Sequence, residues 1–343
     1  MGSPTRWCRD FEIRSNFVKE WWLLGIIDSL SAGYRLLSRR LELLLIPILL
    51  DLFLWMAPRL SIAPLFERVA RFYTDTATLA ELPSEMGLMA QQVAELLSEI
   101  GHSSNLLSLL VRLSGSLLHL PSLLSVVSVP TMGRTYEMVN ISTIFVLGGG
   151  LTLLGLMIGT LYLLLLARQL PIGTANKTWQ WGELPKLTIL YSLRVLVFVL
   201  LLGLLTLALL VPISLGMALV ALVAPGAVPF VAVLFSTLVP ILWLYLYFVP
   251  IGLIVDDLRL PSGIVQSFRL VRDNFWATLG LLLLSMLISA GFSLILSSLV
   301  GYQPFGPVIA ILVNAFIGGG LALGLMVFYR SRILLAQGEQ LEV

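Results

Sequence analysis

Residues 142–168 have the sequence STIFVLGGGLTLLGLMIGTLYLLLLAR, in which the first charged residue is the last one. A helix needs about 20 apolar residues to cross the ~30 Å of hydrocarbon in a bilayer. This run is long enough, and Arg168 follows it as basic residues follow the cytoplasmic ends of spans. The stretch therefore predicts a transmembrane helix that ends at the cytoplasm.

Five further stretches are similarly apolar. Hydrophobic residues make up 58% of the chain and charged residues 12%, about half of the ~25% typical of soluble domains. The six predicted spans are residues 41–58, 142–167, 187–222, 229–255, 277–300 and 305–329. Pro212 lies inside the third and is expected to kink or break it. The sequence predicts an all-α polytopic membrane protein.

Basic residues occur in every second connection, and this alternation gives an orientation. The connections at 224–228 and 301–305 carry no charge, whereas the segments before the first span and after the second, fourth and sixth are basic. Because cytoplasmic loops retain Lys and Arg, both termini are expected in the cytoplasm, with the spans in the plasma membrane. The predicted divisions are a cytoplasmic N-terminus with an interfacial amphipathic helix (1–40), the first span (41–58), an extracytoplasmic insertion (59–141), a five-span membrane domain (142–332) and a cytoplasmic tail (333–343).

The insertion is expected to be helical. Apolar residues recur at helical spacing in residues 62–73 and 86–100, with charged residues opposite, as in amphipathic helices. Residues 105–129 are also apolar, but a crossing there would move every later basic connection outside. We therefore expect 105–129 to be an interfacial or re-entrant helical segment.

An amphipathic segment precedes the first, third and fifth spans, at about residues 22–37, 177–185 and 264–276. In the last of these, Ser267, Arg269 and Arg272 are expected on a polar face opposite an apolar one. Trp276 ends it, and tryptophan favours the headgroup level. The predicted repeat is a cytoplasmic elbow helix followed by a two-span hairpin, used three times.

The segment IVQSFRLVRDNFW at 264–276, followed by an apolar span, resembles an element of certain bacterial membrane proteins. These are the YciC-like proteins and the membrane domain found beside some glycerophosphodiester phosphodiesterases, in which Ser-x-Arg-Leu-Val-x-x-Asn-Phe-Trp leads into a span. The resemblance covers residues 256–332 well, 187–255 loosely and 59–141 not at all. It implies a membrane protein but no activity, since the phosphodiester chemistry belongs to a separate soluble barrel.

Two ionisable residues at predicted membrane depth form the candidate polar site. Asp51 lies in the first span and Arg194 in the third, and such groups usually face a partner or a water-filled path. One hypothesis pairs Asp51 with Arg194 in a proton- or ion-responsive site. The alternative is that Arg194 snorkels to the cytoplasmic interface while Asp51 bonds a neighbouring hydroxyl.

Two GxxxG motifs indicate close helix packing. Gly155 and Gly159 lie in the second span, and Gly320 and Gly324 lie in the sixth. Small residues allow helix backbones to approach closely, so packing is the favoured interpretation. The alternative is passage of a substrate through broken helices.

No catalytic, metal-binding or cofactor-binding motif is visible, and we expect no cofactor. One cysteine cannot form an internal disulfide or a multi-cysteine zinc site. Both histidines, His102 and His119, fall in the insertion, so the spans offer no histidine ligand. Asp256 and Asp257 are expected to point apart in a surface loop. A net charge of +2 argues against a nucleic-acid partner.

The sequence favours a non-catalytic membrane protein that acts as a scaffold, assembly or accessory subunit of a membrane complex. Its expected partners are membrane lipids and other membrane-protein subunits. The alternative is a transporter or lipid-handling protein with a site around Asp51 and Arg194. The first is favoured because polar residues within the spans are few. An enzyme is the weakest class.

Overall fold

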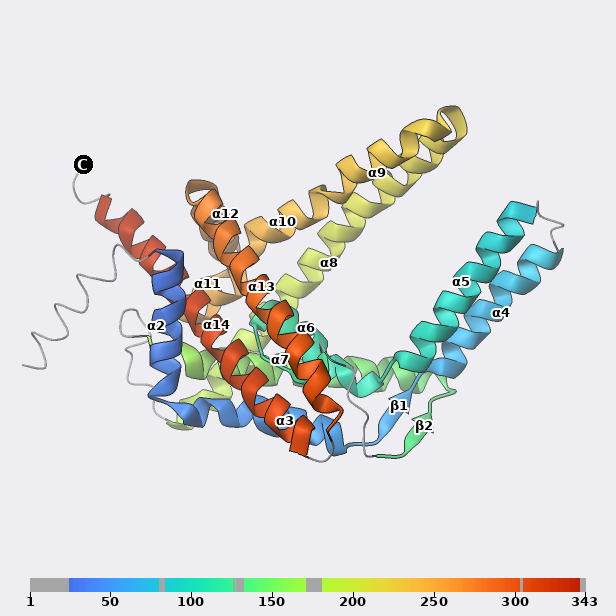
Figure 1. The fold of residues 1–343 in the computed structure, drawn as a ribbon. Helices are drawn as coiled ribbons and strands as arrows, with labels where there is room; N and C mark the ends of the chain where they lie inside the picture. Colours follow the sequence, from blue (N-terminus) through green and yellow to red (C-terminus); the bar gives the residue numbers. More distant parts are fainter. Residues whose placement is uncertain are drawn as a thin grey trace, which may run out of the picture.

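The computed structural model describes residues 25–79, 84–125, 127, 133–170, 181–302 and 305–339, and these residues are mostly helical (Figure 1). Five helical segments are long and apolar enough to cross a membrane, which is the pattern of an all-α membrane protein. They are α7 (Ile141–Ala167), α8 (Leu184–Val223), the segment from α9 to α11 (Val228–Val255), α13 (Phe275–Val300) and α14 (Phe305–Glu339).

The first predicted span is not among these five. Residues 41–58 form a 3₁₀ turn, η2 (Leu41–Leu44), and the helix α3 (Leu45–Met56). Together η2 and α3 fall short of the roughly 20 residues that a span needs. The helix ends because the backbone becomes extended at Ala57, which precedes Pro58.

Pro212 was expected to kink or break its span, and the break does not occur: α8 is one helix of 40 residues with Pro212 inside it. Proline is more frequent in membrane helices than in soluble ones, and it does not force an end here. The next span is broken instead, into α9 (Val228–Ser236), α10 (Leu238–Leu246) and α11 (Val249–Val255). Pro240 and Pro250 lie in the first turns of α10 and α11, where a missing N–H removes no helical hydrogen bond.

Helices occupy two of the three predicted elbow positions. They are α2 (Ile26–Ser38), which lies steeply across the direction of α3, and α12 (Leu260–Asp273), which precedes α13 (Figure 1). The middle predicted elbow covers residues 177–185, of which 177–180 lie outside the described residues. Residues 1–24 and 340–343 of the predicted termini also lie outside them. In the predicted cytoplasmic tail, α14 remains helical as far as Glu339.

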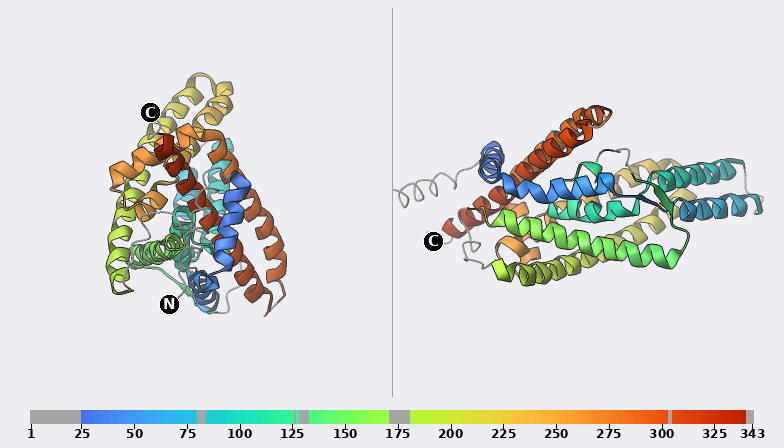
Figure 2. Two further views of the ribbon diagram at one scale, coloured as in Figure 1. Left: turned by 90° about the vertical axis from the view of Figure 1, so that its left-hand side faces the viewer. Right: turned by 90° about the horizontal axis from the view of Figure 1, so that it is seen from below.

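The insertion contains a helical hairpin that projects from the body of the protein (Figures 1 and 2). Its arms are α4 (Ala63–Leu79) and α5 (Ser84–Ser103). The insertion is not wholly helical, because β1 (Arg59–Ser61) pairs in parallel with β2 (Thr135–Glu137), with Arg59 opposite Thr135. The two strands meet because the chain leaves α3 and approaches α7 at the same end of the bundle.

Residues 105–125 fold into the body beside α7 and turn back. After η3 (Leu106–Ser108), α6 (Leu109–Leu118) runs in the same direction as α7, with Leu109 near Gly148 and Leu118 near Gly159. The helix ends at His119, whose φ of 52° is left-handed. The chain then returns through η4 (Leu123–Ser125), and Gly133 lies against Ala57. The segment therefore enters and leaves at one end of the bundle.

The main core lies where α2, α3, α6, α7, α11 and α14 meet. Its largest fully buried side chains include Tyr162, Phe198, Phe248, Phe328 and Tyr329. The Phe248 ring stacks on Phe328 and on Tyr329, with centroids 6.1 and 5.9 Å apart. The first half of α8 contributes Phe198 to this core, whereas its second half extends away from the body with α9 (Figure 1).

Candidate functional site

Asp51 is completely buried, with 0% of its surface exposed, and it holds the returning segment in place. Its carboxylate accepts hydrogen bonds from the Ser122 hydroxyl and from the backbone N–H of Leu123, the latter at 2.7 Å. The Leu123 amide begins η4, where the first N–H groups lack helical acceptors. Asp51 therefore acts as a cap supplied by another helix.

Arg194 lies elsewhere, and the hypothesised Asp51–Arg194 pair is not formed. The Arg194 Nη1 donates to Asp257 Oδ1 at 2.7 Å and to the Leu258 carbonyl at 3.3 Å. Its guanidinium also lies over the ring of Tyr191, 5.3 Å from the centroid. Arg194 is in the third turn of α8, so its side chain reaches the end of the bundle, whereas Asp51 faces the interior.

A second charged network surrounds Asp256, and the sequence reasoning missed it. Asp256 Oδ1 accepts from Arg330 Nη1 at 2.6 Å, and Oδ2 accepts from the Tyr329 hydroxyl at 2.7 Å. Gln266 Nε2 donates to Asp256 Oδ2 at 3.1 Å and to the Tyr329 hydroxyl at 2.7 Å. The side chains of Asp256 and Arg330 are only 10% and 14% exposed. Such a largely buried ion pair is destabilised strongly when one partner is removed.

The two adjacent aspartates do point apart, but they are not plain loop residues. Asp257 has a left-handed φ of 51°, a conformation that Asp adopts more readily than most residues. Asp256 consequently faces α12 and α14, while Asp257 faces α8. Two carboxylates at the end of α11 thus tie three other helices together. The sequence does contain a signal for these two ion pairs. An Asp-Asp pair follows one predicted span, and an arginine lies near the end of each of two others.

Both predicted glycine pairs lie at close helix contacts. A Cβ on Gly155 would overlap the backbone of Leu110, and a Cβ on Gly159 would lie 2.7 Å from Leu118. These contacts pack α7 against α6. The alternative of a broken helix does not fit, because the motifs sit in α7 and α14, each of which is continuous.

The Gly320–Gly324 pair packs α14 against α2. A Cβ on Gly324 would lie 2.8 Å from Leu30, and one on Gly320 would overlap the Tyr34 ring. The Tyr34 hydroxyl donates to the Ile317 carbonyl at 3.1 Å. Burial raises the pKa of Tyr34, so its hydroxyl stays protonated as the donor.

The elbow residues are placed differently from one another. Ser267 is buried, so its predicted position on the polar face with Arg269 and Arg272 is wrong. Its hydroxyl donates to the Tyr245 carbonyl at 2.7 Å. Tyr245 lies just before the break between α10 and α11, and carbonyls at such a helix end lack helical donors. Arg269 is exposed, and Arg272 Nε bonds Asp273 Oδ1 at 2.9 Å.

The remaining candidates do not form a reactive centre. His102 lies near Glu67 on the exposed hairpin, with 3.6 Å between Nε2 and Oε1. The His119 ring lies tilted against the Tyr247 ring, with centroids 4.9 Å apart. Among the described residues, no three His, Cys, Asp or Glu side chains gather where they could hold a metal ion.

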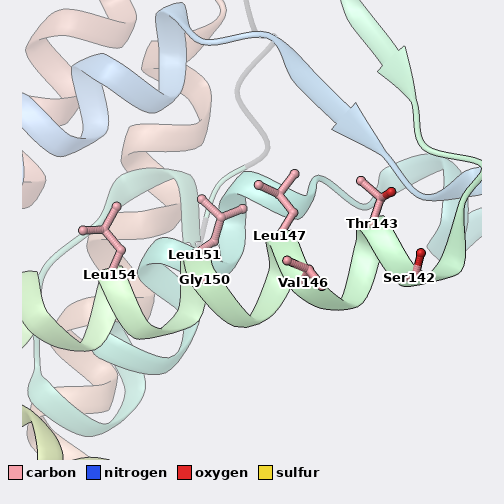
Figure 3. A pocket seen from close by; sticks show the side chains of 7 residues that line it. All are labelled: Ser142, Thr143, Val146, Leu147, Gly150, Leu151 and Leu154. Carbon is pink, nitrogen blue, oxygen red and sulfur yellow. The ribbon is translucent and has the colours of Figure 1, made fainter.

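Two grooves differ in chemistry. One, of about 500 Å³, lies along α7, where Thr143, Leu147, Leu151 and Leu154 point to the same side (Figure 3). Its lining is almost entirely apolar, as expected of a surface that faces lipid. The other, of about 780 Å³, lies between α12 and the C-terminal part of α14 and carries charged and amide side chains.

These features define a helical membrane protein in which paired charges join the helices at one end and a segment folds back into the core. Comparisons with family models, curated proteins and solved structures gave no match. The resemblance of residues 256–332 to the YciC-like and phosphodiesterase-associated membrane domains therefore remains a prediction.

Proposed function

We propose that this chain is a non-catalytic integral membrane protein that serves as a scaffold, assembly or accessory subunit of a membrane complex. One observation carries the proposal. The last buried residue of α8 is Leu202, and the helix continues for 21 further residues to Val223. At 1.5 Å per residue this outer part is about 30 Å long, as long as the hydrocarbon core is thick.

The outer part of α8 and the following α9 form a hairpin that is apolar on all sides. Its exposed side chains include Leu204, Leu207, Leu210, Val211, Leu215, Leu219, Leu222, Val223, Phe230 and Val233. A helix that is apolar all round is covered by lipid or by other helices. The whole of α8 is about 60 Å long, and an apolar helix longer than the bilayer is accommodated by tilting or by association. The surplus length supports association with the helices of a second protein.

The α4–α5 hairpin supplies a second attachment surface. Although its two helices pack on each other, Phe72, Leu88 and Leu96 remain exposed. Exposed apolar patches of this kind mark sites that bind proteins or membranes. In the proposed topology this surface lies outside the cytoplasm.

The proposed topology has six spans in the plasma membrane and both termini in the cytoplasm. It adds the η2–α3 segment to the five long helices. The segment is about 26 Å long, and local thinning of the bilayer accommodates such a short span at modest energy. The alternation of basic and uncharged connections supports this orientation. In it, residues 105–125 are re-entrant from the outer side.

Photocrosslinking from single positions tests the proposal. Leu215 and Leu193 lie on the same helix and are similarly exposed, at 62% and 58%, but only Leu215 is on the outer part. A photoreactive amino acid at Leu215 should give one discrete protein adduct in cells. The same adduct should be recovered when the tag is placed on the crosslinked partner instead. The photoreactive amino acid at Leu193 should give no protein adduct. Lipid adducts alone at Leu215, Leu207 and Leu219 would overturn the proposal.

The alternative, a transporter with a site around Asp51 and Arg194, has less support, because these two side chains do not meet. The two side chains have separate partners, Ser122 and Asp257. Asp51 and Arg194 therefore form no charged pair between the first and third predicted spans.

A further inference from the structure

The polar groove between α12 and α14 has the size and position of a ligand site. Its volume of about 780 Å³ lies within the range of ~300–1,000 Å³ found for small-molecule sites. Its charged and amide side chains come from both helices: Gln266, Arg269, Asp273, Asn274, Arg332 and Gln337. One lining side chain, Gln266, is held in place by hydrogen bonds to Asp256 and Tyr329.

The groove is positively charged. Two arginines line it against one aspartate, a balance of +1. The aspartate, Asp273, already accepts a hydrogen bond from Arg272 Nε at 2.9 Å. Arg330 is nearby in sequence but is neutralised by Asp256 at the other side of the network. The positive charge of the groove therefore comes from Arg269 and Arg332.

Both arginines line this groove. Arg269 is exposed, and within the described part of the chain no carboxylate pairs with it. The Arg332 guanidinium lies over the Phe328 ring, 5.1 Å from the centroid, which limits its orientation. Guanidinium groups bind phosphate through several hydrogen bonds at once, and a pre-oriented one loses less entropy in doing so.

The surroundings of the groove indicate the membrane surface. Trp276, at the start of α13, is 79% exposed, and Val265 and Phe268 on α12 are also exposed. Tryptophan is enriched at the headgroup level. Basic pockets between helices on the cytoplasmic side are suited to anionic headgroups. Phospholipid headgroups carry their phosphates at this level.

We infer that the α12–α14 groove binds the phosphate of an anionic phospholipid headgroup, with Arg269 and Arg332 as its cationic ligands and Gln337 and Asn274 at its edges. The acyl chains leave along the apolar side of α12, past Val265 and Phe268. This inference is independent of the proposed role as a scaffold, since it concerns a lipid and a different surface.

Thermal-shift titration of the full-length protein in a non-ionic detergent tests the inference. The added probes are phosphatidylglycerol, phosphatidylcholine and inorganic phosphate. Phosphatidylglycerol should raise the melting temperature saturably, and phosphatidylcholine should do so only at much higher concentration. Added salt should weaken the effect. If inorganic phosphate saturates the same shift and competes with the lipid, the assigned lipid source is wrong.

Variants locate the effect in the groove. Arg269→Gln should weaken the apparent affinity for phosphatidylglycerol roughly tenfold, since it removes one charged hydrogen-bonding ligand. Gln337→Glu, which adds a negative charge at the other wall, should weaken it as well. The matched control is Arg259→Gln, which removes an exposed arginine at the start of the same helix that does not line the groove. Equal losses for Arg269→Gln and Arg259→Gln, or no loss for Arg269→Gln, would overturn the inference.

Discussion

The Asp256 carboxylate accepts a hydrogen bond from Arg330 at 2.6 Å, although the two residues are 74 positions apart in the sequence. The next residue, Asp257, bonds Arg194 at 2.7 Å across 63 positions. Two acidic side chains at one turn therefore neutralise two arginines from different long helices. This end of the bundle is held by ion pairs, whereas Asp51 holds the returning segment through hydrogen bonds to Ser122 and Leu123.

Asp256→Asn should destabilise the protein much more than Asp257→Asn. The first change leaves Arg330 largely buried without its counter-ion, which costs about 3–5 kcal/mol. The Arg194–Asp257 pair is more exposed, and its loss costs about 1 kcal/mol or less. Thermal unfolding in detergent measures both. The double variant with Asp256→Asn and Arg330→Gln should recover part of the loss, and equal effects of the two single changes would contradict the assignment.

Asp51→Asn should loosen the returning segment. An amide offers one acceptor oxygen where the carboxylate offers two, so its NH₂ group would face either the Ser122 hydroxyl or the Leu123 amide. We expect a loss of about 1–3 kcal/mol, and a smaller loss for Ser122→Ala, which removes one donor. Hydrogen exchange of residues 120–125 should accelerate in Asp51→Asn, while exchange in α13 stays unchanged. Unchanged protection of 120–125 would show that Asp51 is not the cap.

Gly33→Ala should separate α2 from α14. A Cβ at Gly33 would lie 2.7 Å from the Gly324 Cα, a backbone atom that cannot turn aside. Overpacking of this kind costs about 1–3 kcal/mol. Gly203 provides the control, because nothing lies within 4 Å of a Cβ built there. Gly203→Ala should be neutral or stabilising, since alanine favours helix. Melting temperatures that fall equally for both variants would argue against the contact.

Single-cysteine labelling tests the orientation, and Cys8→Ser first provides a cysteine-free background. A cysteine at Glu95, on α5, should react with an impermeant maleimide in intact cells. A cysteine at Ser262, on α12, should react only after permeabilisation. Thr135, in β2, should behave like Glu95, because residues 105–125 return to the side from which they came. The opposite pattern at Glu95 and Ser262 would reverse the topology.

The long apolar runs were predictable because they need no information from elsewhere in the chain. The ends of α7 and α13 fall within two residues of the predicted spans. The polar contacts were harder to predict from the sequence, because Asp256 and Arg330 are brought together only by the packing of α11 on α14. Ser267 was misplaced for a similar reason: its acceptor, the Tyr245 carbonyl, exists only because the span breaks after α10. For Asp51, a hydroxyl partner was one of two alternatives, and Ser122 is that hydroxyl.

The contact between α2 and α14 joins the first described helix of the chain to the last. During synthesis the glycine face of α2 emerges early and has no cover until α14 is made and inserted. Pro121, on the returning segment, likewise rests on Gly318 of α14. Completion of the final helix is thus the step that closes the fold. A chain that stops before α14 therefore leaves two surfaces uncovered at once, one on α2 and one on the returning segment.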